Sequence, residues 1–424
     1  MREMRDSGVE WIGEIPKDWN CCKQKYRFTL INGRAFKDNE FEEDGTYRIL
    51  RVGNLFSNPV WYSSSLELEP DKYCEKGDLI YAWSMSYGPY IWNEEKVIYH
   101  YHIWKTKLVS DMDKMFSYYY LQALTESIKS QTHETTMGFV TMGIMNNSYI
   151  AYPRNIKEQK KISDYLDAKC SKIDEIIEKQ LSIIEKLKEY KLSLITEVVT
   201  KGMNPNVEMR DSGYEYIGLV PYTWEICRLR NIGIPQNGIS KGAEFFGEGY
   251  PFVSYGDVYR NYSLPQNVDG LIMSTEEERE QYSVREKDIF FTRTSETIEE
   301  VGFSSVCEET IPNATYAGFV IRVRPFNDKL TNGFAKYYFR GEHHRIFLAK
   351  EMNLVTRASL GQDLLKSMPV LVPPKAEQDQ IAYYLDNKCR LIDKNIIEKQ
   401  NVIEKLQEYK KSLIYGVVTG KKEI

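Results

Sequence analysis

Two long stretches of the chain place apolar side chains at alternating intervals of four and three residues. The first runs from Ile162 to Val198 and passes through Lys169 and Ile176. This heptad spacing predicts a long helix with one narrow apolar stripe, and Gly202 is typical of its C-terminal end. The predicted stripe residues are Ile162, Leu166, Ile173, Ile184, Leu187 and Leu194 in the first stretch, and Ile381, Leu385, Ile392, Ile396, Ile403, Leu406 and Leu413 in the second.

The two stretches are copies of each other. Residues 158–200 align without gaps on 377–419 at an offset of 219, with 24 identities in 43 positions. A helix of this length spans about 65 Å and cannot bury its stripe alone. The nearest partner is the other copy, so we expect the two helices to pair as an antiparallel coiled coil. The alternative is two independent helices, each packed on its own globular half.

A shorter repeat, which we call the strap, opens each half. Residues 4–19 and 209–224 match at ten of 16 positions at an offset of 205. Trp19 and Trp224 predict an extended segment that is anchored by a buried aromatic and docks on the domain that follows. The order is therefore strap, domain and long helix, twice. If the helices are antiparallel, the C-terminus lies near the N-terminus and the layout is closed and pseudo-two-fold.

The segments between the straps and the helices have a different pattern. Short apolar runs such as 78–83 and 288–292 are broken by turn residues, which predicts strands interrupted by one or two helices. The fold class that we predict is α+β, with two β-rich domains separated by the two long helices. The predicted boundaries enclose residues 1–155, 156–205, 206–375 and 376–424.

Composition narrows the possible classes of protein. The 424 residues are 42% hydrophobic and 28% charged, and this length is enough for two to four domains. No run of 18 apolar residues and no apolar signal core occur, so we expect no membrane span, no export and a cytoplasmic location. The seven cysteines form no CxxC pair, which argues against a zinc site. The net charge of −5 does not itself indicate nucleic-acid binding.

The repeated motifs resemble the specificity subunit of type I restriction–modification systems. The resemblance covers the whole chain and rests on the duplicated pattern EQxxIxxYLD, which ends in VVT and follows Pro153 in one half and Pro373-Pro374 in the other. The strap pattern SGxxxIGxxPxxW and the strand-like segments 249–258 and 47–55 also fit the family. The first half departs from the family pattern at 136–139.

This resemblance implies a non-catalytic DNA-recognition subunit that binds no cofactor itself. Each globular segment would be a target-recognition domain that reads one half of a split, asymmetric site in double-stranded DNA. The paired helices would set the unread spacer and dock two methyltransferase subunits, which carry S-adenosylmethionine. Restriction motor–nuclease subunits, which use ATP and Mg, would join for cleavage.

Reading of DNA requires cations at phosphates and arginine, asparagine or glutamine at base edges. In a mildly acidic chain a local patch of such residues is sufficient. We expect Arg51, Asn54, Arg293 and Arg357 to reach bases; the alternative for each is a surface residue or a structural ion pair. The full set of DNA-binding candidates is Lys37, Arg48, Arg51, Asn54, Lys241, Tyr255, Tyr259, Arg260, Arg293, Arg357 and Lys366.

Sequence motifs for catalysis are nearly absent. The chain has no GxxxxGK[ST], GxSxG or HExxH pattern and no adenine-methyltransferase signature. The pair His100 and His102 is interpreted as alternate positions on one strand. Asp78, Glu94 and Lys96 can be matched to a metal-nuclease pattern, so a self-sufficient nuclease is one alternative function. A coiled-coil scaffold whose β-rich domains bind protein is another.

Overall fold

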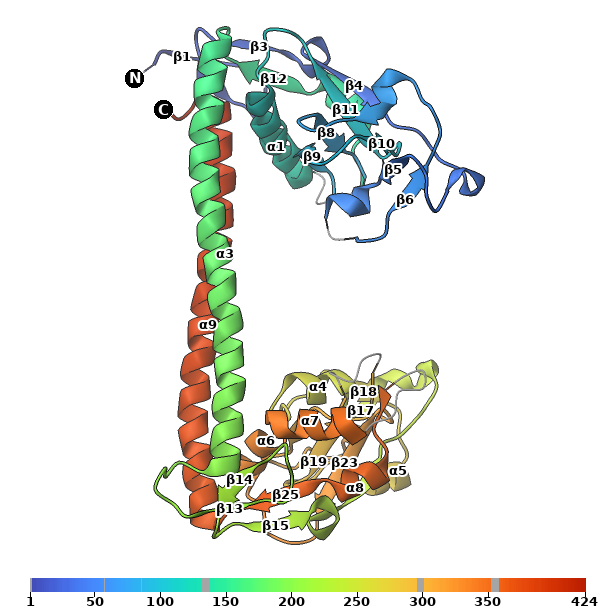
Figure 1. Ribbon diagram of the computed structural model, residues 1–424, viewed down its shortest axis with the longest axis vertical. Coiled ribbons are helices and arrows are strands. Elements are labelled where there is room, and N and C mark those ends of the chain that lie inside the picture. The colour runs from blue at the N-terminus through green and yellow to red at the C-terminus, as the bar shows by residue number, and fades with distance from the viewer. Residues whose placement is uncertain (1, 57, 85, 132–137, 296–300, 352–357) are drawn as a thin grey trace. The chain divides into compact units, whose positions relative to one another are not determined.

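The computed structural model describes the chain apart from residues 1, 57, 85, 132–137, 296–300 and 352–357. The chain divides into two compact units. Unit 1 comprises Met1–Gln180 and Gln400–Ile424, and unit 2 comprises Leu181–Lys399. Each unit therefore contains one strap, one β-rich domain and a part of each long helix (Figure 1).

Unit 1 contains two four-stranded sheets and a helix that lies against one of them. One sheet has the order β4 (Phe28–Asn32), β11 (Ile103–Leu108), β8 (Leu79–Ala82) and β9 (Gly88–Ile91). The other has the order β6 (Tyr62–Ser64), β5 (Tyr47–Leu50), β10 (Val97–Tyr99) and β7 (Tyr73–Cys74). Two-stranded pairs join β1 (Met4–Asp6) to β2 (Glu14–Pro16) and β3 (Asn20–Lys23) to β12 (Tyr149–Tyr152). The helices of the domain are α1 (Lys114–Gln131), which contacts β9, and α2 (Met142–Asn147).

Unit 2 repeats most of this topology, but its second sheet has three strands. Its sheets have the orders β16 (Gly233–Asn237), β23 (Val320–Pro325), β19 (Ile289–Thr292), β21 (Ser304–Val306), and β18 (Leu271–Ile272), β17 (Phe246–Val253), β22 (Thr315–Tyr316). The two-stranded pairs are β13 (Met209–Asp211) with β14 (Leu219–Pro221), β15 (Glu225–Arg228) with β25 (Pro369–Val372), and β20 (Thr294–Ser295) with β24 (Ala358–Ser359). Its short helices are α4 (Tyr255–Arg260), α5 (Glu276–Gln281), α6 (Asn332–Tyr338), α7 (Glu342–Glu351) and α8 (Gln362–Ser367). The predicted α+β class is confirmed.

The long helices are α3 (Ile156–Lys201) and α9 (Lys375–Val418). Every residue of the predicted stripe list is buried except Leu187 and Leu406, which are half-buried. Lys169 and Ile176, however, are exposed, and the adjacent Cys170 and Ile177 turn inward. The prediction was wrong at these two positions because a helix with 3.6 residues per turn drifts by roughly 20° per heptad against a strict repeat.

The two helices pair antiparallel in each unit (Figure 1). In unit 1 Asp174 of α3 contacts Lys410 of α9, and in unit 2 Lys191 of α3 contacts Asp393 of α9. The alternative of two unpaired helices is therefore wrong. The antiparallel pairing also brings the chain ends together in unit 1, where the backbone N–H of Arg2 donates to Glu423 at 3.0 Å.

The repeated EQxxIxxYLD motif fastens the strap and the domain to the helix. In unit 1 Glu158 accepts a hydrogen bond from the indole of the buried Trp19 at 3.3 Å. The side chain of Gln159 is fully buried and makes three hydrogen bonds to backbone groups, among them the N–H of Asp113 at 2.8 Å. Asp167 accepts a 2.6 Å hydrogen bond from the hydroxyl of Tyr119 on α1.

The same connections recur in unit 2. Glu377 accepts from the indole of the buried Trp224 at 2.9 Å, and Asp386 accepts from the hydroxyl of Tyr337 on α6 at 2.7 Å. Gln378 is again fully buried and makes three hydrogen bonds to backbone groups. The motif therefore has a structural role in both halves. Among the described residues, no helix is long and apolar enough to cross a membrane.

Candidate functional site

Each unit carries a turn at the edge where two parallel strands end. In unit 1, β5 and β10 run parallel, and their ends lead into Arg51 and the turn 100–102. In unit 2, β17 and β22 run parallel, and their ends lead into Ser254 and the turn 317–319. We call this place the strand-end edge. It comprises Arg51, Trp83 and residues 100–102 in unit 1, and Ser254, Arg293 and residues 317–319 in unit 2.

The backbone of the strand-end edge is held by the same hydrogen bonds in both units. In unit 1 the N–H of Trp83 donates to the carbonyl of His102 at 3.1 Å, and the carbonyl of Trp83 accepts from Val140 at 2.8 Å. In unit 2 the N–H of Arg293 donates to the carbonyl of Phe319 at 2.8 Å, and its carbonyl accepts from Leu360, also at 2.8 Å. Trp83 and Arg293 are therefore equivalent, and so are His102 and Phe319.

The edge of unit 1 is aromatic. Tyr81 stacks on Trp104 with ring centroids 5.8 Å apart, and Trp104 stacks on Trp83 at 5.9 Å. The ladder continues to His102, whose ring lies edge-on to Trp83 at 4.9 Å. The indole N–H of Trp83 donates to the carbonyl of Tyr101 at 2.7 Å. This series of rings fixes the orientation of the half-buried Trp83.

One arginine accompanies this aromatic edge. The guanidinium of Arg51 lies 4.9 Å from the ring centre of Tyr62. Burial, with His102 and Arg51 as further causes, lowers the pKa of His100 to about 4. Burial and Arg51 also lower the pKa of His102. The two imidazoles belong to the turn between β10 and β11, so their interpretation as alternate positions on one strand was wrong.

The edge of unit 2 presents different side chains on the same backbone. Phe319 is 65% exposed at the turn. The half-buried Arg293 lies beside it, and its Nη1 donates to the carbonyl of Gly318 at 3.4 Å. Ser254, which replaces Arg51, accepts from the N–H of Asp257 at 3.2 Å and so caps α4.

Two of the other unit 1 candidates, Arg48 and Asn54, make side-chain contacts within the domain. Arg48 is ion-paired to Glu94 at 2.9 Å and to Glu95 at 2.8 Å. The side-chain amide of Asn54 accepts from the N–H of Arg51 and donates to the carbonyls of Asn58 and Val60. Lys37 is exposed, before a short 3-10 helix. Of the four unit 1 candidates, the strand-end edge contains Arg51 alone.

The unit 2 candidates are distributed over several elements. Lys241 is ion-paired to Glu278 at 2.6 Å, and the half-buried Lys366 is ion-paired to Asp363 at 3.1 Å. Tyr255 and Tyr259 stack on each other on α4, with ring centroids 6.0 Å apart. Arg260, at the end of α4, is exposed and donates to the carbonyl of Gly256. Arg293 lies at the strand-end edge, whereas Arg357 is outside the described residues.

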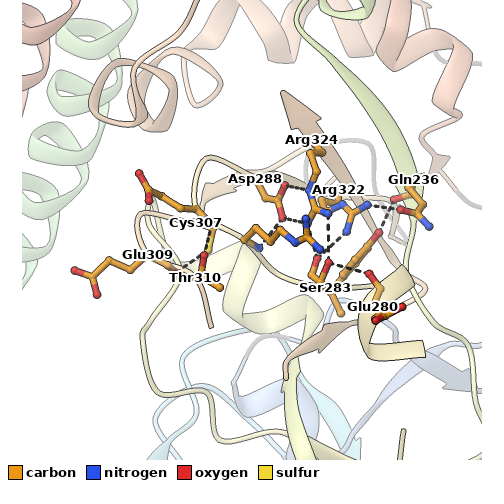
Figure 2. A network of polar contacts seen from close by, with 12 residues as sticks. Gln236, Glu280, Ser283, Asp288, Cys307, Glu309, Thr310, Arg322 and Arg324 are labelled. Atoms are coloured by element: carbon orange, nitrogen blue, oxygen red, sulfur yellow. Dashed lines mark hydrogen bonds and ion pairs between the residues drawn. The ribbon is translucent and has the colours of Figure 1, made fainter. Parts of the chain in front are cut away.

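A buried ionic network surrounds Asp288, the residue that precedes β19. The side chain of Asp288 is fully buried, and it accepts two hydrogen bonds from Arg324, at 2.8 and 2.6 Å, and one from the N–H of Arg285 (Figure 2). Arg322, which lies on β23 together with Arg324, donates to the side chain of Gln236 and to the carbonyl of Ser283. The two arginines thus join β23 to β16 and to the segment that precedes β19.

Asp78, the aspartate of the nuclease alternative, has the equivalent role before β8. It accepts from Lys105 at 2.7 Å and from the N–H of Glu75 at 2.8 Å. Glu94 is paired instead with Arg48, and Lys96 with Glu75. Among the described residues no group of three or more His, Cys, Asp or Glu side chains could hold a metal ion.

Comparison with known proteins connects this architecture to a family. The family model described as the type I restriction modification DNA specificity domain matches residues 16–186 and again 221–408. The chain belongs to this family. As a specificity subunit it is a DNA-binding component of type I restriction–modification, and the two matches coincide with the repeated topology.

Similar specificity subunits come from a bacterium and an archaeon. The specificity subunit of the type I restriction enzyme EcoBI of Escherichia coli is 20% identical over 99% of this chain and 89% of its own length. That of MjaVIII of Methanocaldococcus jannaschii is 23% identical over 73% of this chain and 70% of its own length. A chain solved in a study of complex assembly and conformational transition of the type I system shares the fold, with a TM-score of 0.70, 14% identity and coverage of 96% and 99%.

Sequence reasoning did not select several residues that lie at the strand-end edge of this specificity subunit. Trp83, Tyr101 and Phe319 were not among the DNA-binding candidates, which are mainly residues with cationic or amide side chains. A usable signal was present, since both turns follow a strand whose last residue is a tyrosine, Tyr99 or Tyr316. Both tyrosines donate their hydroxyls to backbone carbonyls and so anchor the turn.

Proposed function

We propose that this specificity subunit reads a bipartite, asymmetric DNA site, with one half-site assigned to each unit. The observation that supports this most strongly is the strand-end edge. Its backbone hydrogen bonds are the same in the two units, but Trp83 in one is replaced by Arg293 in the other, and His102 by Phe319. One frame with two different sets of side chains suits two different sequences, because base contacts depend on side-chain chemistry.

We further propose that the paired helices set the spacer between the half-sites and dock two methyltransferase subunits. The exposed apolar side chains that α3 and α9 keep outside their buried stripe support docking. They include Ile176 and Tyr409 in unit 1, and Leu181, Tyr190, Tyr383, Leu391 and Ile397 in unit 2. Under this proposal the chain carries out no catalytic step and binds no cofactor. The methyltransferase partners supply S-adenosylmethionine, and restriction subunits supply ATP- and Mg-dependent cleavage.

The test is single-molecule methylome sequencing of a host that expresses this chain with its methyltransferase. A split, adenine-methylated motif that disappears when this chain is deleted is the expected result. Methylation that is unchanged by the deletion would contradict the recognition role and favour a scaffold.

The spacer proposal has a separate test. One heptad is inserted into each helix, at the equivalent positions after Ser182 and Asn401, so that the antiparallel register is kept. Seven residues add about 10 Å of helix, and we expect the spacer of the methylated motif to lengthen by roughly three base pairs. An active variant with the original spacer would contradict the proposal.

A further inference from the structure

We propose that the turn at the strand-end edge is the base-reading element of each unit. In unit 2 the reading side chains are Phe319 and Arg293, and in unit 1 they are Tyr101, His102 and Trp83. This inference rests on the proposed function, because it assumes that each unit reads one half-site.

The exposure of Phe319 is the first argument. Its side chain is 65% exposed, although a phenylalanine gains stability by burial. The turn at the strand end exposes this side chain, so that it can contact a methyl group or the flat face of a base. The methyl group of thymine and the face of an unstacked base are apolar surfaces that such side chains contact in DNA.

The rigidity of the turn is the second argument. The N–H of Val320 donates to the carbonyl of Ala317 at 2.9 Å, and the N–H of Ala317 donates to Val253 at 3.0 Å. A Cβ atom on Gly318 would lie 2.2 Å from the hydroxyl oxygen of Ser240, so the turn is packed closely against the neighbouring segment. A site on such a fixed backbone holds its side chains in one geometry, which base discrimination requires.

The position of Arg293 is the third argument. The backbone N–H of Arg293 donates a hydrogen bond to the carbonyl of Phe319, and its carbonyl accepts one from the N–H of Leu360. Its guanidinium lies beside the turn, where the contact to Gly318 is long at 3.4 Å and so is readily exchanged. Arginine bound to the O6 and N7 atoms of guanine is the commonest specific contact to a base. The edge therefore combines an apolar side chain with a guanine-reading cation.

Unit 1 has the same frame but a different set of side chains. His102 takes the place of Phe319, Tyr101 that of Gly318 and Trp83 that of Arg293. Trp83 is stacked on Trp104, so it is a fixed platform. The change from a cation and a phenylalanine to indole, imidazole and phenol predicts that the two half-sites differ in sequence.

The test uses the complex of this chain with its methyltransferase. Phe319→Ala and Arg293→Ala are each compared with the wild-type chain and with Phe326→Ala. Phe326 is a matched control because it is 59% exposed and lies beyond the other end of β23. Affinity is measured for the methylated motif and for unrelated DNA, and the methylome is sequenced for each variant. Thermal unfolding of each variant shows whether it is folded.

We expect Phe319→Ala and Arg293→Ala to weaken binding of the motif roughly 10-fold while leaving unrelated DNA within about two-fold. The sequence requirement should relax in one half-site only, and Phe326→Ala should match the wild type. Tyr101→Ala and His102→Ala should relax the other half-site. Folded variants that keep the full motif and affinity would overturn this inference and leave the proposed function standing. Absence of a split motif with the wild-type chain would instead contradict the proposed function.

Discussion

The ammonium of Lys191 lies 2.8 and 2.7 Å from the two carboxylate oxygens of Asp393. The sequence repeat aligns Lys191 with Lys410 and Asp393 with Asp174, and these two residues form the same contact at 2.7 and 2.6 Å. One ion pair is thus made twice, once in each unit. Paired charges that flank an apolar stripe set the register of coiled coils. The duplicated pair therefore favours the antiparallel register seen in both units.

Removing one partner of this pair should weaken the helix pairing modestly. Asp393→Asn leaves the ammonium of Lys191 without its carboxylate. We expect a loss of about 0.5–1 kcal/mol in the free energy of unfolding, because the carboxylate is half exposed. The exchange Lys191→Asp with Asp393→Lys should recover most of that loss. Urea unfolding at low and high salt measures both effects.

A control is available on the same helix. Glu175 and Lys179 form an exposed pair within α3 at 2.6 Å, and the pair does not involve α9. Glu175→Gln should leave stability unchanged. If Asp393→Asn behaves in the same way as Glu175→Gln, the interhelical pair does not stabilise the register.

The buried glutamine of the repeated motif should be far more sensitive. Gln378→Leu removes the partner of the Thr331 N–H and of the Lys329 and Pro373 carbonyls. Since these groups are shielded from water, we expect unit 2 to lose about 3 kcal/mol. Gln400→Leu, at an exposed position of α9, is the matched control and should change little. Equal stabilities of the two variants by urea unfolding would contradict the role of Gln378.

The meeting of the chain ends predicts that a circular permutant folds. In unit 2, residues 203–206 form an exposed link between α3 and the second strap, whereas the corresponding connection in unit 1 is the contact of Arg2 with Glu423. Joining residue 424 to residue 1 by a short linker and opening the chain at Pro205 should keep Tm within a few degrees. Opening α3 at Ile184 interrupts its buried stripe and should prevent folding. A permutant at Pro205 that fails to fold would show that the covalent link is required.

Two buried histidines predict acid sensitivity of unit 2. His343 and His344 are buried in α7 beside the ring of Tyr338. Burial lowers the pKa of His343 to about 3. Burial, with His343 and Arg345, lowers that of His344. An unfolded histidine has a pKa near 6.5, so below that pH the unfolded state binds protons that the folded state does not.

The sign of this effect is a loss of stability on acidification. Above about pH 6.5 these groups contribute no pH dependence. Below about pH 6.5 each should reduce the free energy of unfolding by up to about 1.4 kcal/mol per pH unit, and for His343 this effect continues to about pH 3. Urea unfolding near pH 7, 6 and 5 measures this slope. His343→Leu should remove roughly half of the contribution of the two histidines, and an unchanged slope in that variant would contradict the explanation.

The sequence predicted the frame of the molecule well because the frame is repeated. The heptad spacing and the long repeat predicted both long helices and their pairing. The shorter repeat predicted that Trp19 and Trp224 are buried. The exception is the stripe near Lys169 and Ile176, where the helix period of 3.6 moves Cys170 and Ile177 inward. A strict heptad cannot show where this drift occurs.

The candidate site was harder to predict because partners determine the role of a polar residue. Arg48 and Asn54 have side chains of the kinds that contact DNA. In the structure, however, Arg48 is ion-paired to Glu94, and Asn54 is hydrogen-bonded to the loop backbone. Phe319 carries no polar signal, and its exposure depends on a turn whose hydrogen-bonding partners, Val253 and Arg293, are distant in sequence. Pairing of these strands is a tertiary property, so the sequence alone did not distinguish Phe319 from a core residue.

The most direct test of the central claim exchanges one domain. Residues 20–155 are replaced by the equivalent segment of another specificity subunit whose motif is known, and the host methylome is sequenced at single-molecule level. We expect one half-site to change to that of the donor while the other half-site stays the same. A methylated motif that is unchanged, or one that changes in both halves, would contradict the assignment of one half-site to each unit.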